Sequence, residues 1–190
     1  MNQNDRITES NERYLKRRKR LKEAREWIFS LGIAVCASLL IQNYAYAQTK
    51  VHNVSMQNTL VEGQRLIEDK WSYRFHAPER GDIVIIYGDQ FDTRLVKRVI
   101  GLPGETIAMR NGTVYIDEEP LKEPYAKGES FEGSLQMPLV VPEDEFFVLG
   151  DNRERSLDSR SFGTVPKSAI EGKIVFRIWP VHDFGLLDKK

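Results

Sequence analysis

The chain has 190 residues, of which 28 are Lys or Arg and 28 are Asp or Glu, so its formal net charge is zero. This length suits one domain with an appended segment, and the neutral balance disfavours a dedicated nucleic-acid-binding protein, which usually carries a basic excess. A single cysteine, Cys36, excludes an intrachain disulfide and a multi-cysteine zinc site, and the three histidines form no metal-binding motif. We therefore expect no metal, no cofactor and no nucleic-acid partner.

The charges are distributed unevenly along the chain. Residues 1–26 contain nine Lys or Arg and five Asp or Glu, a net charge of +4, and the following 23 residues contain no charged side chain. A helix of about 20 apolar residues crosses the hydrocarbon core of a bilayer, and Trp27, Tyr44 and Tyr46 are positioned as aromatic anchors at its two interfaces. Because Lys and Arg stay cytoplasmic, the pattern predicts a cell-membrane protein with a single pass. Its expected parts are a basic cytoplasmic segment at 1–26, a transmembrane signal-anchor helix at 27–47 and an extracytoplasmic domain at 48–190.

Two other interpretations of the apolar segment remain open. It could be a buried core helix, although the basic cluster and the aromatic ends favour a membrane. It could also be a cleavable signal peptide, because Ala45-Tyr46-Ala47 before Gln48 resembles a cleavage site. The basic lead of 26 residues is long for a signal peptide, so we expect an uncleaved anchor. A mature N-terminus at Gln48, measured by mass, would contradict this expectation.

The remainder of the chain is typical of a mainly β domain with antiparallel sheets. Asn111-Gly112 stands between Thr106–Arg110 and Thr113–Asp117, whose apolar residues alternate with polar ones, and this is a strong signal for a two-residue hairpin. Long helical periodicity is absent after residue 50. The other expected strands are Gln64–Glu68, Asp82–Tyr87, Glu145–Leu149 and Lys173–Trp179.

A lysine with apolar neighbours is the first candidate for chemistry. If residues 94–105 form a strand, Leu95, Lys97 and Val99 share one face and the two arginines point away from it. Burial disfavours the charged amine, and a lysine base at neutral pH needs its pKa lowered from about 10.4 to roughly 7–8, which costs about 3–4 kcal/mol. The alternative is a lysine whose tip reaches water.

Two further segments contain polar side chains of the kind that active sites use. Ser55 lies in Val51–Leu60, directly after the predicted span, where a serine by itself is more typical of a solvated turn. His52 formally allows a Ser-His-Asp triad, but no G-x-S-x-G motif supports one. The loop Gly150–Gly163 carries three charges of each sign between glycines, so it is either a solvated loop with local ion pairs or the polar wall of a site.

Four motifs in this order resemble the type I signal peptidases, the membrane-bound serine proteases that remove signal peptides. The resemblance covers nearly all of residues 27–180, and the short, single-anchor layout is similar to that of Gram-positive members. The motifs are Ser55-Met56-x-x-Thr59-Leu60, Arg80-Gly81-Asp82-Ile83-Val84, Lys97-Arg98-Val99-Ile100-Gly101-x-Pro103-Gly104-Glu105, and Gly150-Asp151-Asn152-Arg153 followed by Ser156-x-Asp158-Ser159-Arg160.

The resemblance implies a role for each matching side chain. Ser55 would be the nucleophile and Lys97 the general base of a Ser/Lys dyad. Ser156 would orient the lysine, and Asp158 and Arg160 would form an ion pair that braces the site. The backbone N–H of Ser55 would contribute to the oxyanion hole.

The chain departs from the family pattern at two positions. Many members have proline where this chain has Asn58, which leaves the turn after the nucleophile freer than a proline would. Some members supply a second oxyanion donor from a serine two residues before the nucleophile. That position is Asn53 here, and we predict that its side-chain amide is the donor.

The resemblance also implies the substrate and the partners. The expected activity is removal of signal peptides from exported preproteins after small residues at −1 and −3, at the lipid bilayer. Ala45-Tyr46-Ala47 matches this pattern, which permits self-cleavage. Trp71, Tyr73 and Phe75 alternate if the chain is extended there, and they suit either the lipid interface or an apolar core.

Two rival functions are compatible with parts of the sequence. One is a catalytically impaired, membrane-tethered relative that binds exported chains or a partner; Asn58 is the feature that favours it, and the presence of both Ser55 and Lys97 speaks against it. The other is the related Ser-Lys self-cleaving repressor, which would need a DNA-binding module.

Overall fold

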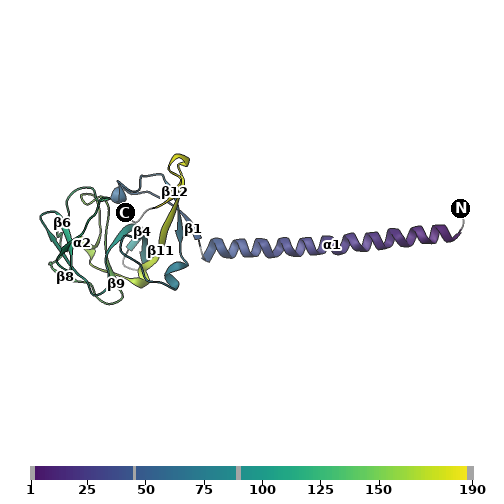
Figure 1. Ribbon diagram of the computed structural model, residues 1–190, viewed down its shortest axis with the longest axis horizontal. Helices are drawn as coiled ribbons and strands as arrows, with labels where there is room; N and C mark the ends of the chain where they lie inside the picture. The colour runs from purple at the N-terminus through teal and green to yellow at the C-terminus, as the bar shows by residue number, and fades with distance from the viewer. Residues whose placement is uncertain (1–2, 45, 89–90, 188–190) are drawn as a thin grey trace. The chain divides into compact units, whose positions relative to one another are not determined.

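The computed structural model describes residues 3–44, 46–88 and 91–187, with side chains for residues 18–39, 46–88 and 93–187. The chain divides into two compact units, Met1–Asn43 and Tyr44–Lys190. The first consists of helix α1 (Gln3–Tyr44), and the second is built mainly of strands (Figure 1). Every pair of neighbouring strands in both sheets is antiparallel, so the prediction of a mainly β domain with antiparallel sheets is confirmed.

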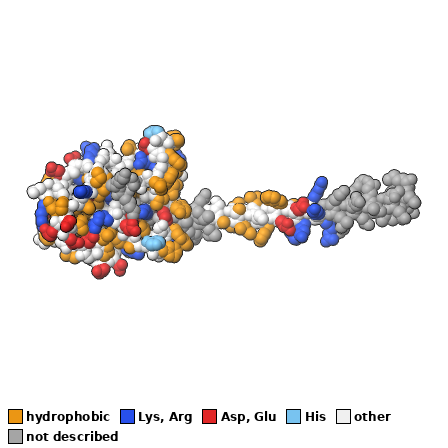
Figure 2. Space-filling view, viewed as in Figure 1, with side chains coloured by type: hydrophobic (Ala, Val, Ile, Leu, Met, Phe, Trp, Pro, Cys, Tyr) orange, Lys and Arg blue, Asp and Glu red, His pale blue; other side chains and the backbone are white. Residues whose placement is uncertain are grey.

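Helix α1 is longer than the predicted span and contains residues 3–26 of the basic segment as well. Figure 2 shows charged side chains at one end of its described part and hydrophobic side chains along the rest, where Trp27 and Phe29 are exposed. Among the described residues, no helix has the length and apolar character that a membrane crossing requires. The helix ends at Tyr44 and not at residue 47 as predicted, because Tyr46 and Ala47 pair with a neighbouring strand.

The larger sheet has eight strands in the order β1-β2-β11-β3-β4-β9-β10, with β12 beside β11. The long strands β4 and β11 lie within it and are joined by β3, which pairs with both. Their bounds are β1 (Tyr46–Lys50), β2 (Arg65–Asp69), β3 (Ile83–Gly88), β4 (Phe91–Gly101), β9 (Glu145–Leu149), β10 (Val165–Pro166), β11 (Ile170–Trp179) and β12 (Gly185–Leu186).

The smaller sheet has the order β7-β6-β5-β8, and Figure 1 shows it at the end of the β-rich unit away from β1 and β12. The predicted hairpin is confirmed: Asn111 and Gly112 have φ of 50° and 77°, and a two-residue type I′ turn needs positive φ at both positions. The strands are β5 (Thr106–Arg110), β6 (Thr113–Ile116), β7 (Glu119–Pro120) and β8 (Leu139–Val140).

The larger sheet buries side chains on both faces. Ile83 and Ile85 pack with Met56 and Leu60 on one face, while Val84 and Ile86 pack with other apolar residues on the opposite face. This explains why the β3 sequence is a continuous apolar run and not an alternating one. The cluster around Met56 and Leu60 is the one that matters for the site, because it fixes the segment that contains Ser55.

Short helical turns connect the strands, and one of them corrects a prediction. Trp71, Tyr73 and Phe75 do not alternate in an extended chain, because the 3-10 turn η2 (Ser72–Arg74) lies there. The carboxylate of Asp69 accepts hydrogen bonds from the N–H groups of Trp71 (2.8 Å) and Ser72 (3.0 Å), which turns the chain. The other turns are η1 (Val54–Met56), α2 (Ser159–Phe162), η3 (Lys167–Ala169) and η4 (Val181–Asp183).

Candidate active site

Ser55 lies in the turn η1, between two anchored ends of the same loop. Val51 N–H donates to Gln64 O at 2.9 Å on one side, and the buried side chains of Met56 and Leu60 hold the other side in the core. The carbonyl of Ser55 accepts a hydrogen bond from Asn152 N–H at 2.9 Å. The side chain of Ser55 is 8% exposed, so it stands at the edge of the fold, next to solvent but held in place.

Lys97 reaches Ser55 from strand β4. Its residue pairs with Val84 of β3, and its side chain is 2% exposed, so the alternative of a lysine whose tip reaches water does not hold. Nζ lies 3.0 Å from Ser55 Oγ and 3.1 Å from Val96 O. A neutral amine at this distance can accept the hydroxyl proton of Ser55.

The surroundings of Lys97 make the neutral amine accessible near neutral pH. Burial is the main cause that lowers its pKa, from 10.5 to about 8, and the positive charge of Arg160 acts in the same direction. The carboxylates of Asp158 and Asp151 oppose the change. With a pKa of about 8, roughly a tenth of the amines are neutral at pH 7, against fewer than about one in a thousand for an unperturbed lysine.

Asp158 and Arg160 form a bidentate ion pair close enough to Lys97 for both charges to affect its pKa. Arg160 Nε and Nη2 each donate to the Asp158 carboxylate at 2.8 Å. Burial raises the pKa of Asp158, but the hydrogen bonds and charge of Arg160, with smaller contributions from Gly150 N–H and Ser156, outweigh it and hold that pKa below its usual value. Arg160 also donates to Arg153 O at 2.8 Å, so the pair ties the loop after β9 together.

Ser156 belongs to the same loop, and among the described side chains no hydrogen bond joins it to Lys97. Its Oγ is buried, and within the described ranges it has no hydrogen bond of regular geometry. A β-carbon on Gly150 would contact both the Ser156 side chain and Ser55 O, the latter at 2.5 Å. At Gly150, the loop after β9 and the segment Val51–Leu60, which contains Ser55, therefore approach each other too closely to leave room for a side chain.

A second buried ion pair was missed by sequence reasoning. Arg98 does point away from Lys97, as expected, but it is fully buried and not solvated. Its Nε and Nη2 donate to the Asp151 carboxylate at 2.8 and 2.7 Å, and its Nη1 donates to Gly81 O at 2.9 Å. Thr59 Oγ1 also bonds to Asp151. The sequence did contain a signal for this ion pair, because Thr59, Arg98 and Asp151 each belong to one of the four motifs described above.

Asn58 and Asn53, the two positions that depart from the family pattern, have different structural environments. Asn58 has a φ of 112°, far from the value of about −65° that proline requires, and its Nδ2 donates to Tyr125 O at 3.1 Å. The turn as folded therefore excludes proline and is held by a side-chain bond. Asn53 is exposed, and together with Ser55 it lines a groove that is described below. Where side chains are described, no hydrogen bond or ion pair joins His52 to Ser55. The structure therefore adds no support to the interpretation of a Ser-His-Asp triad.

A groove of about 670 Å³ opens at Ser55. Strand β9 pairs with β4 only from Arg98 to Gly101, so no described strand covers that edge of β4 from Thr93 to Lys97. An extended peptide can add to such an edge. The groove is lined by Gln48, Thr49, Lys50, Val51, His52, Asn53, Ser55, Met56, Ile85, Tyr87, Thr93, Arg94 and Val96.

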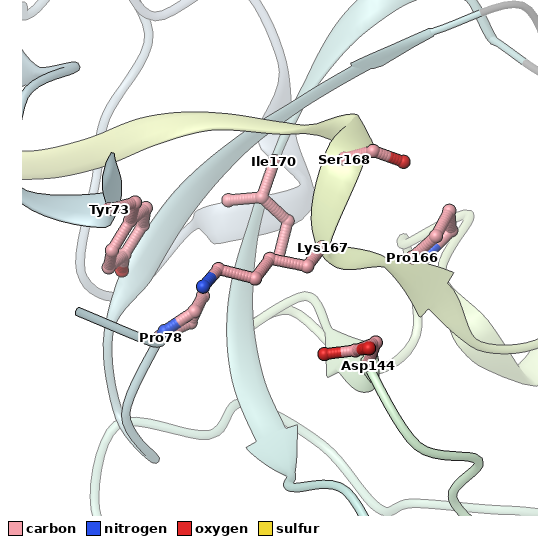
Figure 3. A pocket seen from close by; sticks show the side chains of 7 residues that line it. All are labelled: Tyr73, Pro78, Asp144, Pro166, Lys167, Ser168 and Ile170. Atoms are coloured by element: carbon pink, nitrogen blue, oxygen red, sulfur yellow. The ribbon is translucent and has the colours of Figure 1, made fainter. Parts of the chain in front are cut away.

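A second hollow of about 540 Å³ lies elsewhere on the β-rich unit (Figure 3). Its lining includes Tyr73, Asp144 and Lys167, and it contains none of the predicted site residues. Among the residues that the structure describes, no group of His, Cys, Asp or Glu side chains could hold a metal ion. The distance of 3.0 Å between Lys97 Nζ and Ser55 Oγ supports the chemistry of a hydroxyl nucleophile with an amine base.

Comparison with known proteins gives the class of protein to which this site belongs. Residues 24–179 match the family model described as signal peptidase, peptidase S26. The chain therefore belongs to the signal peptidase family S26.

Individual relatives resemble the chain over most of its length. The signal peptidase I of Bacillus licheniformis is 38% identical over 173 residues, which cover 86% of this chain and 92% of that protein. The signal peptidase IB of Staphylococcus aureus strain Mu50 is 32% identical over 179 residues, with 86% and 93% covered. A crystal structure of a signal peptidase I from Enterococcus faecalis V583 is 38% identical and covers 52% of this chain and 97% of its own, with a TM-score of 0.46.

Proposed function

We propose that this protein is a signal peptidase I, a serine endopeptidase that removes signal peptides from exported preproteins by a Ser55/Lys97 dyad. One observation carries the proposal: a buried lysine amine lies 3.0 Å from a serine hydroxyl at the edge of an open groove. The names of the relatives support the same activity. Small residues at −1 and −3 of the substrate are the proposed specificity, as the family resemblance implies.

In the proposed mechanism, the neutral amine of Lys97 takes the hydroxyl proton as Ser55 Oγ attacks the scissile carbonyl. The ammonium then gives this proton to the leaving amine, the peptide C–N bond breaks, and an acyl-Ser55 ester remains. Water attacks the ester with Lys97 as the base again, which releases the signal peptide and regenerates Ser55. The N–H of Ser55 and the side-chain amide of Asn53 stabilise the oxyanion.

The remaining predicted residues would hold this geometry. Arg160 and Asp158 would fix the loop after β9 through Gly150 N–H, which donates to Asp158 at 3.0 Å. Ser156 is the proposed acceptor for the Lys97 ammonium once the amine is protonated. Its support is that a β-carbon on Gly150 would lie 2.5 Å from both Ser156 Cβ and Ser55 O, so Gly150 leaves room for the two serines to lie close together.

We also propose that the protein is anchored in the cell membrane by residues 27–44, with the basic segment inside and the β-rich unit outside. The support is the uncharged run from residue 27 to residue 49 and the net charge of +4 before it. This topology would put Ser55 on the side where exported preproteins emerge, so that lipid bilayer and preproteins are its two partners.

The proposal is tested with the full chain in detergent and a preprotein that has Ala at −1 and −3. We expect one cut after the −1 residue, identified by the masses of both products, no cut by Ser55→Ala, and no cut when −1 is a bulky residue. Cleavage that survives Ser55→Ala would defeat the dyad. Absence of cleavage by the wild-type chain would favour the impaired relative, and retention of the preprotein on the immobilised chain would measure its binding.

Replacing Asn53 with Ala tests the oxyanion donor. We expect kcat to fall by about 10²- to 10³-fold with little change in KM, because loss of one donor weakens the transition state more than the bound substrate. Steady-state kinetics with the same preprotein give both constants. Asn53→Ser keeps a donor and should recover part of kcat; an unchanged kcat in Asn53→Ala removes Asn53 from the mechanism.

The pH dependence of cleavage tests the role of Lys97. Only the neutral amine is a base, and burial lowers its pKa to about 8. We therefore expect kcat/KM to rise with pH, about tenfold per unit below the midpoint, and to level off above a midpoint at about pH 8. Rates measured from about pH 6 to 10 in one series of buffers of constant ionic strength give this profile. A rate that is independent of pH below 8 would contradict it.

A further inference from the structure

Segment 123–130, which we call the bracing segment, lies between β7 and β8 and contacts the loop after β9. Lys127 forms a parallel bridge with Asn152, and Lys127 N–H donates to Asp151 O at 2.7 Å. Asn152 N–H in turn donates to Ser55 O at 2.9 Å. The bracing segment is thus joined to the backbone of Ser55 through one intervening residue.

Both ends of the bracing segment are pinned by one guanidinium. Arg153 donates to the two carboxylate oxygens of Glu123, at 2.9 and 2.6 Å, and it also bonds to Ser130 Oγ. The side chains of Arg153 and Glu123 are 1% and 8% exposed. Because this ion pair is shielded from water, it fixes the segment far better than a surface pair would.

Tyr125, in the bracing segment, contacts both the loop that contains Ser55 and the strand that contains Lys97. Its carbonyl accepts the hydrogen bond from Asn58, three residues after Ser55. Its ring lies over the guanidinium of Arg98, 3.9 Å from Cζ to the ring centroid, and Arg98 is the neighbour of Lys97 in β4. The backbone atom therefore contacts the nucleophile loop, while the ring contacts the strand of the base.

We propose that Tyr125 is a positioning residue that sets the distance between Ser55 Oγ and Lys97 Nζ. The inference rests on the proposed function, because it assigns Tyr125 to the same reaction. The residues that line the groove at Ser55 include none from the bracing segment. Tyr125 thus acts on the alignment of the reacting groups, which appears in kcat, and not on substrate binding, which appears in KM.

The test is steady-state cleavage of the preprotein by Tyr125→Leu and Tyr125→Phe in the full chain. We expect Tyr125→Leu to lower kcat about tenfold, since misplacement of reacting groups by about 1 Å can cost up to about 10²-fold, and to leave KM within about twofold. Tyr125→Phe keeps the ring over Arg98 and loses only the hydroxyl bond to Glu123 at 3.2 Å. It should restore kcat to within about twofold of wild type.

A matched control is Tyr115→Leu. The half-buried Tyr115 ring also faces a guanidinium, that of Arg110 at 5.5 Å, but it lies in the smaller sheet, which contributes no residue to the groove at Ser55, so kcat should not change. A folded Tyr125→Leu with wild-type kcat, or one that changes KM instead, overturns the proposal. If Tyr125→Leu does not fold, Asn58→Gly decides, because glycine accepts a positive φ and removes the bond to Tyr125. A lower kcat in Asn58→Gly supports the proposal and an unchanged one overturns it, whereas cleavage by Ser55→Ala would overturn the proposed function itself.

Discussion

Replacing Lys97 with Met is expected to lower kcat by about 10⁴-fold or more, the size seen when one member of a nucleophile–base unit is removed. Methionine has a similar length and carries no charge into the buried position, but it has no atom basic enough to take the proton of Ser55. Lys97 is 2% exposed, and its amine lies within hydrogen-bond distance of Ser55 Oγ. Single-turnover cleavage of the preprotein, followed for hours, measures the residual rate.

The folded state should tolerate Lys97→Met. A loss of activity in this variant can then be assigned to the lost base and not to unfolding. Burial of the Lys97 ammonium disfavours the folded state below the lowered pKa of about 8, so an uncharged side chain removes that penalty. We expect the thermal midpoint of Lys97→Met at pH 7 to be no lower than that of the wild type. The double variant Ser55→Ala, Lys97→Met should be no slower than either single variant, because the two residues act as one unit. Cleavage within tenfold of wild type would show that another group is the base.

Replacing Arg98 with Met is expected to reduce the free energy of unfolding by about 3–5 kcal/mol, since it leaves a buried carboxylate without its partner. Asp151 and Arg98 are both fully shielded from solvent and share two hydrogen bonds of 2.7–2.8 Å. A domain of ordinary stability has only about 5–15 kcal/mol in total, so the loss is a large fraction of it. Urea unfolding of the full chain in mild detergent, followed by tryptophan fluorescence, measures the change.

The matched control for this prediction is an exposed ion pair of the same chemistry. Arg110 and Glu118 are bonded at 2.7 Å with side chains 50% and 65% exposed, and Arg110→Met should leave the unfolding midpoint nearly unchanged because water replaces the partner. Replacing both buried partners, Arg98→Met with Asp151→Leu, should recover much of the lost stability, because no charge then remains unpaired. An Arg98→Met variant as stable as Arg110→Met would contradict the prediction.

Arg98 and Lys97 show why neighbours in one strand can have opposite roles. Successive side chains of β4 point to opposite faces, and here both faces are buried. The amine can lose its proton and become a base, whereas the guanidinium keeps its charge and needs a permanent counter-ion. The sequence Lys97-Arg98 therefore places the proposed base on one side of the sheet and a structural ion pair on the other.

Much of the fold was predictable because it depends on local patterns. The hairpin at Asn111-Gly112 follows from a turn that needs positive φ at two successive residues, and β9 was predicted at its observed bounds, Glu145–Leu149. The alternation around Lys97 placed it on a strand face with apolar neighbours, but it left open whether the tip of the side chain reaches water. Where local patterns compete with side-chain hydrogen bonds they mislead: Asp69 turns the chain at Trp71, although the alternating aromatic residues there suggested a strand.

The candidate site could be predicted in its membership but not in its geometry. The motifs named Ser55, Lys97, Ser156, Asp158 and Arg160, whose roles remain proposals. Nothing in the order of residues shows that Asn152 N–H holds the carbonyl of Ser55, or that Tyr125 covers Arg98. Ser55 and Asn152 are 97 residues apart, and Arg98 and Tyr125 are 27 residues apart, so no local pattern contains these contacts.

The sequence by itself determined the family, the β-rich class and the residue types of the candidate site, because motifs and alternation are properties of neighbouring positions. Only the tertiary structure decided that Lys97 is buried and lies 3.0 Å from Ser55, which lowers its pKa to about 8. It also decided that Arg98 is an internal counter-ion and that Asn58 adopts a turn closed to proline. The physical reason is that pKa, burial and turn strain depend on what surrounds a group in space, and those surroundings are assembled from distant segments.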